Sequence, residues 1–431
     1  MFFPLIAQAQ DQPVIKLSVD KEIGDVIRLG IKGAPDVQIK GVKEVFQGGL
    51  GWFDHKSYTL TAKEVSIVGR VEELDCSDND ITELEIAQNP HLEILVCQDN
   101  MLQTIDFSKS AVLRDLIARG NVFSTLDLRP LKNLNALALS FNKLSGIDLS
   151  ENANLYDLHL SGNNLTNLDL SKNKKLAYLT CENNVQLTWI EIAPDNKLLN
   201  LNINGNKLSP HAMDYLVKRL QTVPEAAKEK DGKLVVVDSK NPKEIQKLSR
   251  ATVAMAVAKG WKVLDRNAEN PQPYEGVDIN IEVKLPEVEH ARLSVKGNPN
   301  LEAVPFGTEL ELVVEPEVDY RVVEVKVDGV VLKAPYKFVV TKEPEIVVVV
   351  KHKTSVHDVV ATAFSLHPNP AVSYVELSGG EPGATVQLLD LSGRLVLERK
   401  LSTDARVDVS TLAKGIYLIK VGKHVSKLSI R

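Results

Sequence analysis

Two consecutive stretches, Leu134-Asn-Ala-Leu137-Ala-Leu139-Ser-Phe-Asn142 and Leu155-Tyr-Asp-Leu158-His-Leu160-Ser-Gly-Asn163, share one pattern and begin 21 residues apart. Each has leucines at its first, fourth and sixth positions and an asparagine at its ninth. The pattern fills residues 71–206 in seven copies, and the asparagines are separated by five steps of 21 residues and one of 22. A fixed period of this length predicts a solenoid, in which each repeat stacks on the next. The ninth-position asparagines are Asn79, Asn100, Asn121, Asn142, Asn163, Asn184 and Asn206.

The repeat spacing predicts a parallel sheet with one short strand per repeat. The leucines point inward, and stacking at about 4.8 Å per strand gives a coil roughly 30 Å long. Asparagine carries both an amide donor and a carbonyl acceptor. We therefore expect the asparagines to form a ladder that satisfies backbone groups where the chain leaves each strand.

The pattern resembles that of leucine-rich-repeat proteins, and the layout of the chain is similar to internalin-type adhesion proteins. Cys76, Cys97 and Cys181 take the sixth, inward position of their repeats. We interpret them as small buried core residues, with a metal or redox site as the alternative. An odd number of cysteines argues against a disulfide scaffold.

The outward face of the predicted sheet combines apolar and aromatic side chains. A contiguous exposed apolar patch is typical of an interaction surface. Two alternatives are ordinary filling of a shallow sheet and coverage by a flanking domain. Residues 71–206 hold 19 acidic and 10 basic side chains, which favours a neutral or basic partner. The candidate binding residues are Ile94, Val96, Ile117, Arg119, Ala138, Tyr156, His159 and Tyr178.

The segments around the repeats predict further domains. The apolar start, residues 1–9, ends in Ala7-x-Ala9 and resembles the remnant of a secretory signal peptide. We expect an N-terminal β cap over 10–70, with 64–67 as a degenerate opening turn, and an α/β C-terminal cap over 207–268, whose second helix includes Ile245. After a linker at 270–273, period-two alternation over 277–352 predicts an all-β module with a hairpin at Asp328-Gly329.

The last segment, residues 362–431, predicts a small β-sandwich in which Gly393 and Gly415 serve tight turns. Its Pro-Asn-Pro, Asp-x-x-Gly-Arg and Leu-x-x-Gly-x-Tyr motifs resemble the C-terminal sorting domain of type IX secretion cargo in Gram-negative bacteria of the Bacteroidetes group. The resemblance implies contact with the secretion machinery and export across the outer membrane, to the cell surface or the medium. The motif residues are Pro368, Asn369, Pro370, Asp390, Gly393, Arg394, Gly415 and Tyr417.

Composition and motifs exclude several classes of function. The formal net charge is −6, and the sequence has no Lys/Arg cluster that would neutralise a run of phosphates, so we do not expect a nucleic-acid partner. Beyond the first residues, no apolar run approaches the roughly 20 residues of a transmembrane segment. No histidine pair has metal-ligand spacing, and phosphate loops and nucleophile elbows are absent from the sequence. We therefore expect no catalytic residue, no metal and no cofactor.

The sequence thus predicts a mainly β protein with some α, made of a leucine-rich-repeat solenoid with a helical C-terminal cap, an all-β module and a C-terminal β-sandwich. We interpret it as a non-catalytic surface protein that binds a host or bacterial surface protein or glycoprotein through the concave sheet. Adhesion, host-cell interaction, biofilm formation and virulence are the roles that this implies. A self-associating surface-layer or matrix component and an uncharacterised secreted hydrolase are the alternatives.

Overall fold

The computed structural model describes residues 12–46, 51–228, 231–268, 270–353, 364–379, 382–422 and 424–431, so the predicted signal-peptide remnant lies outside the described residues. The chain divides into two compact units. The first comprises Met1–Lys284, Pro299–Leu310 and Phe338–Pro344, and the second comprises Leu285–Asn298, Glu311–Lys337 and Glu345–Arg431. Strands predominate and helices are few. The fold is mainly β with some α, which confirms the predicted class.

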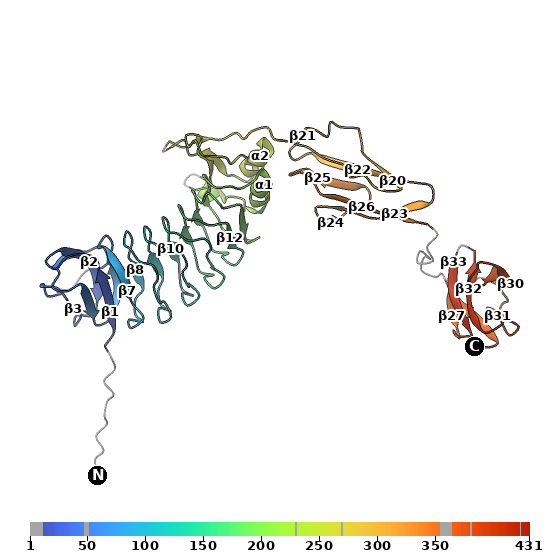
Figure 1. Ribbon diagram of the computed structural model, residues 1–431, viewed down its shortest axis with the longest axis horizontal. Helices are drawn as coiled ribbons and strands as arrows, with labels where there is room; N and C mark the ends of the chain where they lie inside the picture. Colours follow the sequence, from blue (N-terminus) through green and yellow to red (C-terminus); the bar gives the residue numbers. More distant parts are fainter. Residues whose placement is uncertain are drawn as a thin grey trace, which may run out of the picture. The chain divides into compact units, whose positions relative to one another are not determined.

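Residues 71–206 coil as a solenoid with one parallel strand per repeat (Figure 1). The fourth-position leucines lie opposite one another, because Leu95 pairs with Leu74 on one side and with Leu116 on the other. The same register continues as far as Leu201. One sequence period therefore equals one step across the sheet. The strands are β6 (Val71–Asp75), β8 (Ile94–Val96), β9 (Asp115–Ile117), β10 (Ala136–Ala138), β11 (Asp157–His159), β13 (Tyr178–Thr180) and β15 (Asn200–Asn202).

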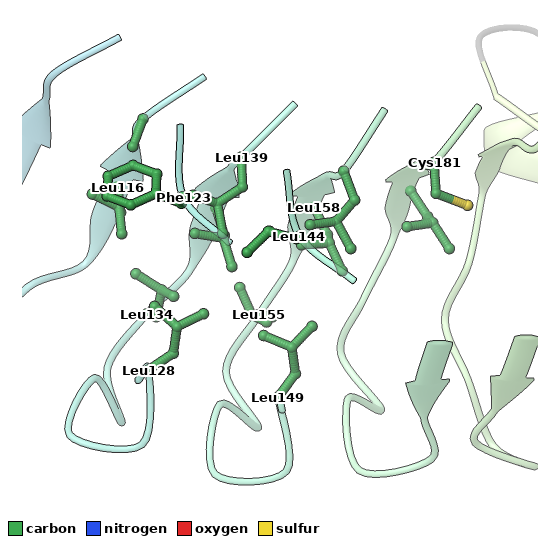
Figure 2. Packing of buried hydrophobic residues seen from close by; sticks show 14 of the residues in the cluster. Leu116, Phe123, Leu128, Leu134, Leu139, Leu144, Leu149, Leu155, Leu158 and Cys181 are labelled. Atoms are coloured by element: carbon green, nitrogen blue, oxygen red, sulfur yellow. The ribbon is translucent and has the colours of Figure 1, made fainter. Parts of the chain in front are cut away.

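The interior of the coil is filled by the leucines of successive turns, as Figure 2 shows. Leu134, Leu137 and Leu139 have no exposed surface. Burial of a leucine side chain contributes about 1.5–3 kcal/mol, and only the stacked neighbours complete that burial. The three cysteines are free and buried in the same core, as their inward position predicts.

The ninth-position asparagines hydrogen-bond to the backbone of adjacent turns. The amide of Asn121 donates to the carbonyls of Cys97, Ala118 and Arg119 at 2.9, 3.2 and 3.3 Å. Its Oδ1 accepts from the backbone N–H of Leu102 at 3.0 Å. Each such side chain therefore ties its own turn to the preceding one.

A second, shorter series of buried asparagines, not predicted from the sequence, lies on the other side of the coil. Asn152 and Asn173 are 21 residues apart and almost fully buried. The amide of Asn173 donates to the carbonyls of Leu149 and Asn152 at 3.1 and 2.9 Å. The two short strands on this side, β12 (Asn167–Leu170) and β14 (Trp189–Ile192), pair in parallel.

The N-terminal part of the unit caps the first turn with two sheets. β2 and β4 extend the solenoid sheet beyond β6 in antiparallel pairing. β7 joins β1, β5 and β3 in a second sheet. The prediction of an opening turn at 64–67 is wrong, because β5 pairs antiparallel with β1 and belongs to this cap. The strands are β1 (Val14–Val19), β2 (Val26–Gly33), β3 (Gln38–Lys40), β4 (His55–Thr59), β5 (Glu64–Val68) and β7 (Ile81–Glu85).

After β15 the sheet continues into an α/β segment. β16 (Lys233–Val237) and β17 (Lys262–Asp265) add to it in parallel, and β18 (Gln272–Pro273) closes it in antiparallel pairing. Helix α1 (Pro210–Arg219) is capped by Ser209 and α2 (Arg250–Ala258) by Ser249. The second helix is shorter than predicted: it begins after the Ser249 cap and leaves Ile245 outside it, exposed to solvent. A 3-10 turn, η1 (Glu225–Ala227), lies between them.

The all-β module contains short antiparallel pairs. β19 pairs with β21, β20 with β22, and β23 with both β24 and β26. The predicted hairpin at Asp328-Gly329 is confirmed, because Val327 pairs with Val330 and both turn residues have positive φ. The strands are β19 (Asn280–Ile281), β20 (Ala291–Val295), β21 (Val304–Pro305), β22 (Glu309–Pro316), β23 (Tyr320–Val327), β24 (Val330–Val331), β25 (Tyr336–Val339) and β26 (Ile346–His352).

The C-terminal segment folds as two antiparallel sheets around a separate core. Val375, Leu377, Val386 and Leu388 are fully buried in that core, from strands of both sheets. One sheet has the order β27-β28-β31 and the other β30-β29-β32-β33. The strands are β27 (Ser365–His367), β28 (Tyr374–Ser378), β29 (Thr385–Leu389), β30 (Leu395–Lys400), β31 (Arg406–Asp408), β32 (Gly415–Val421) and β33 (His424–Ile430).

Candidate functional site

The predicted binding residues lie on the side of the solenoid sheet opposite its leucine core, but its N-terminal end is not exposed as expected. Ile94 and Val96 are only 9% and 3% exposed, so the prediction of an accessible apolar patch there is wrong. On this face Ile94 is flanked in register by Glu73 and Asp115. Parallel strands lie only about 4.8 Å apart, so such neighbours cover short apolar side chains.

The N-terminal cap also reaches this end of the face. His55 Nε2 lies 3.1 Å from Asp75 Oδ2, and Asp75 is the register partner of Val96. Lys32 Nζ lies 2.9 Å from Glu73 Oε1, the partner of Ile94. The carboxylate of Glu73 raises the pKa of Lys32, which keeps this contact an ion pair. The face therefore becomes accessible only further along the solenoid.

The middle of the face is shallow. Ile117, Ala136 and Ala138 are half-buried. Ala136 and Ala138 stand directly between Asp115 and Ile117 on one strand and Asp157 and His159 on the next. Methyl side chains therefore occupy the centre of this part of the face, with longer residues in register on either side.

A hollow of about 230 Å³, with a mostly apolar surface, follows at the C-terminal end of the face. We call it the C-terminal hollow. It joins residues of the last repeats to β16 of the C-terminal cap. Its lining residues are Asp157, His159, Tyr178, Leu179, Thr180, Asn200, Leu201, Asn202, Lys233 and Val235.

His159 is held between two partners in the C-terminal hollow. Its Nδ1 lies 2.8 Å from Thr180 Oγ1, and its Nε2 lies 3.0 Å from Asp157 Oδ1. The contact with the Asp157 carboxylate raises the pKa of His159, against the opposing effect of burial. The ring is therefore fixed in orientation, and its charge depends on pH near neutrality.

Two tyrosines contact each other beside the hollow. The rings of Tyr156 and Tyr178 contact edge to face, with centroids 5.4 Å apart. Contact with Tyr156, burial and the nearby carboxylate of Asp231 together raise the pKa of Tyr178 to about 12. Asp231 also accepts a hydrogen bond from the amide of Asn200 at 2.8 Å. Asp231 and Lys233 were not predictable from the repeat pattern, because they belong to the C-terminal cap. Asn200, by contrast, lies at an outward position of the last repeat.

The backbone before each ladder asparagine adopts the left-handed conformation, with φ between 54° and 70°. Glycine and asparagine, and to a lesser extent aspartate, tolerate this region. Six of the seven positions hold such residues, and Phe141 is the exception. The series is Asp78, Asp99, Gly120, Phe141, Gly162, Asn183 and Gly205.

Phe141 is 55% exposed in spite of its size. The guanidinium of Arg119 lies over its ring, 5.3 Å from the centroid. A Cβ on Gly162 would lie 2.8 Å from the ring atom Cδ1 of Phe141, so the absent side chain makes room for the ring. We call Arg119 and Phe141 the rim pair. The outward positions of the repeat predict Arg119 but not Phe141. The signal for Phe141 is a phenylalanine in a column that otherwise holds glycine, asparagine and aspartate.

The described residues contain no group of three or more His, Cys, Asp or Glu side chains placed to hold a metal ion. Burial raises the pKa of the Cys97 and Cys181 thiols far above neutrality, which makes them poor nucleophiles. Neither α-helix in the described ranges has the length and apolar content of a membrane span.

The C-terminal motif residues stabilise turns and contacts between separate segments of the second unit. Asp390 Oδ1 accepts from the backbone N–H groups of Ser392 and Arg394 at 2.9 and 3.0 Å, and Arg394 Nε donates to Oδ2 at 3.1 Å. Gly393 has φ of 85°, as a tight turn requires. The same expectation for Gly415 is wrong, because Gly415 begins β32 and pairs with Ile430.

The remaining motif residues lie nearby in the same fold. The side chain of Asn369, between Pro368 and Pro370, both donates a hydrogen bond to β33 and accepts one from it. Its amide donates to the Lys427 carbonyl at 2.8 Å, and its Oδ1 accepts from the Ser429 N–H at 2.9 Å. The hydroxyl of Tyr417 donates to the Ala413 carbonyl at 2.9 Å.

Comparison with known proteins agrees with this geometry at the C-terminus. Residues 365–431 match the family model described as secretion system C-terminal sorting domain. No curated protein matches the chain.

Two solved structures are similar to parts of the chain. The functional domain of InlJ from Listeria monocytogenes, described as including a cysteine ladder, is 26% identical over 44% of this chain, with a TM-score of 0.35. A leucine-rich-repeat protein of Leptospira interrogans is 18% identical over 45% of this chain and 71% of its own, with a TM-score of 0.25. This chain spans only 38% of the length of the InlJ structure.

The repeat register, the stacked leucines and the asparagine ladder define the fold of residues 71–206, and the family match defines the role of the last 67 residues. The chain is a leucine-rich-repeat protein with a type IX secretion C-terminal sorting domain, which directs it to the cell surface or the medium.

Proposed function

We propose that this chain is a non-catalytic surface protein that binds a protein or glycoprotein partner through the concave sheet, in adhesion, host-cell interaction or biofilm formation. The observation that carries the proposal is the rim pair. A residue with a Cβ in the left-handed region costs about 1–2 kcal/mol, and an exposed ring gains little burial in return. Strained, exposed aromatic residues are typical of binding sites.

The surroundings of the rim pair suit a protein surface. Phe141 offers an apolar anchor, and Arg119 beside it offers a cation for a carboxylate on the partner. The C-terminal hollow adds fixed polar groups, namely His159, Tyr178 and Asn200. Aromatic and arginine anchors surrounded by polar groups are the usual composition of energetically important contact sites.

The sorting domain supports a second contact. We propose that residues 365–431 are recognised by the type IX secretion machinery during export, with the turn at Asp390–Arg394 among the contacts. Asp390 fixes that turn by accepting four hydrogen bonds, while the side chain of Arg394 is left largely exposed.

The binding proposal is tested with full-length protein on beads, incubated with epithelial cells and with intact bacterial cells. The variant Phe141→Asn, combined with Arg119→Ser, removes both anchors and keeps a residue that suits the backbone at position 141. We expect at least a tenfold loss of attachment, as for removal of a central anchor. Val185→Asn is the matched control, because Val185 is equally exposed, at 59%, on the same solenoid. Undiminished attachment of the double variant would exclude the rim pair.

A specific observation favours self-association as a second candidate. Four valines on the hydrogen-bonded strands β23, β24 and β26 are between 42% and 62% exposed: Val323, Val330, Val331 and Val347. Val331 and Val347 flank Lys326 in register and therefore share one face of this small sheet. Exposed apolar side chains on one face favour contact between copies. A matrix component would show a mass above 47.5 kDa in light scattering of the purified chain, and Val→Thr changes at these positions would reduce it.

A further inference from the structure

A groove runs beside β7 at the first turn of the solenoid. Its volume is about 640 Å³, within the range of about 300–1,000 Å³ that is typical of ligand sites. Its walls are residues 82–88 and 103–106, so the groove follows the strand over most of its length and continues past its end. We call it the cap groove. It is formed by residues that neither the concave face nor the sorting domain uses.

The cap groove exists because β7 pairs with the N-terminal cap and diverges from the next turn. β7 is the outer strand of the sheet β3-β5-β1-β7. In the described part of the chain, the one backbone hydrogen bond between β7 and residues 101–106 joins Met101 N to Ile81 O at 2.8 Å. Further along the solenoid, the corresponding strands β12 and β14 pair over four residues. Beyond Ile81, the outer edge of β7 therefore faces open space.

An open strand edge presents unpaired N–H and C=O groups, and such edges bind extended peptides by strand addition. The floor of the cap groove is apolar, since Leu84, Ile86 and Ile105 are each at most 5% exposed. It therefore offers backbone partners along one wall and apolar contact below. A polypeptide in extended conformation satisfies both requirements, whereas a helix, with its backbone groups already paired, does not.

Charge decides which extended segment fits. Glu83, Glu85 and Asp106 line the cap groove with exposed carboxylates. Lys16, with Nζ 3.6 Å from Glu85 Oε2, is the one basic side chain that pairs with any of them among the described ion pairs. The edge of the cap groove therefore carries a net negative charge, which attracts lysine and arginine and repels acidic segments.

We propose that the cap groove binds an extended, basic segment of a partner polypeptide by strand addition to β7. Backbone bonds to β7 hold the segment, alternate side chains lie over Leu84 and Ile105, and lysines on the opposite side meet Glu83 and Asp106. The site is independent of the concave face, so a segment bound here leaves the rim pair and the C-terminal hollow free.

The test uses the full-length chain and the fluorescein-labelled peptide Lys-Val-Thr-Val-Lys-Thr. We expect saturable binding by fluorescence anisotropy, together with slower amide hydrogen exchange at 82–88 and 103–106. The same peptide with alternate N-methylated amides, and its counterpart with glutamate in place of lysine, should bind about tenfold more weakly or not at all. Exchange that slows elsewhere, or equal affinity for the three peptides, would overturn the proposal.

Protein variants give a second, matched readout. Glu83→Lys with Asp106→Lys reverses the charge of the groove, and Glu151→Lys with Glu302→Lys makes the same change in net charge at exposed positions elsewhere. We expect affinity for the basic peptide to fall about tenfold in the first pair only. An equal fall in affinity for both double variants would mean that the peptide responds only to the net charge of the protein. That result would overturn the proposed site. Attachment through the rim pair should not change in either.

Discussion

At position 141, a phenylalanine occupies a backbone conformation that suits asparagine or glycine. Phe141→Asn should therefore raise the free energy of unfolding of the solenoid by about 0.5–1 kcal/mol, although it removes a ring and the contact with Arg119. Phe141→Val keeps the strain with a β-branched residue and should lower it. Calorimetric melting of the full chain measures both changes. Equal melting temperatures for the two variants would mean that position 141 is not strained.

His159 makes the stability of the solenoid depend on pH. Its pKa is raised in the folded chain by Asp157, so the protonated form is favoured in the folded state. The resulting stability is fully present below the ordinary histidine pKa of about 6.5 and is lost as the pH rises through the higher folded value. The melting temperature of the wild type should therefore fall more between pH 5.5 and pH 8.5 than that of His159→Gln. A pH profile that is the same for both proteins would contradict the role of this ion pair.

The burial of residues at inward positions was predictable from the sequence, whereas the exposure of residues at outward positions was not. Leu137 and Asn121 follow from the period, because each has one environment that repeats at every turn. The accessibility of Ile94 depends on the N-terminal cap, whose Lys32 and neighbouring groups reach the first strands from outside the repeat. The strain at Phe141 follows from a backbone angle that no side-chain pattern specifies, although comparison down its column would have singled it out.

At the scale of the element, the asparagine ladder is the device that holds one turn to the next. Asn121→Ala leaves the buried N–H of Leu102 without its acceptor. It also removes one of the two asparagine amides that donate to each of the carbonyls of Cys97 and Ala118. We expect a loss of about 3 kcal/mol, since each buried unsatisfied group costs about 1–3 kcal/mol. Asn133→Ala is the control: its amide also bonds to the preceding turn, at Ala111 O, but at an exposed site. That change should stay within about 0.5 kcal/mol, and urea unfolding of the two variants compares them.

Elements inside the periodic region were predictable because spacing alone sets their register. Those at its borders were not, since pairing partners there come from distant sequence. β5 alternates in the same way as an opening turn would, and only its antiparallel partner β1 places it in the cap. The start of α2 was misplaced because the apolar residues Ile245 and Leu248 continue the helical spacing across the Ser249 cap.

At the scale of the whole molecule, folding and export use separate parts of the chain. The solenoid core and the C-terminal core share no residue: one runs from Ile15 to Val263, and the other from Phe364 to Ile430. Each unit thus buries its own apolar side chains. Loss of the sorting domain should therefore remove the export signal without unfolding the solenoid.

Deletion of residues 362–431 tests that separation in cells that carry the type IX system. We expect the shortened chain to accumulate in the periplasm and to be absent from the surface and the medium, because the domain that matches the sorting family is gone. Fractionation with antibodies against the solenoid measures the distribution, and circular dichroism of the periplasmic material checks that the β structure persists. Gly393→Val, which strains a turn at φ of 85° without shortening the chain, should reduce export in the same direction. Surface display of the deleted chain at the wild-type level would mean that the export signal lies elsewhere in the sequence.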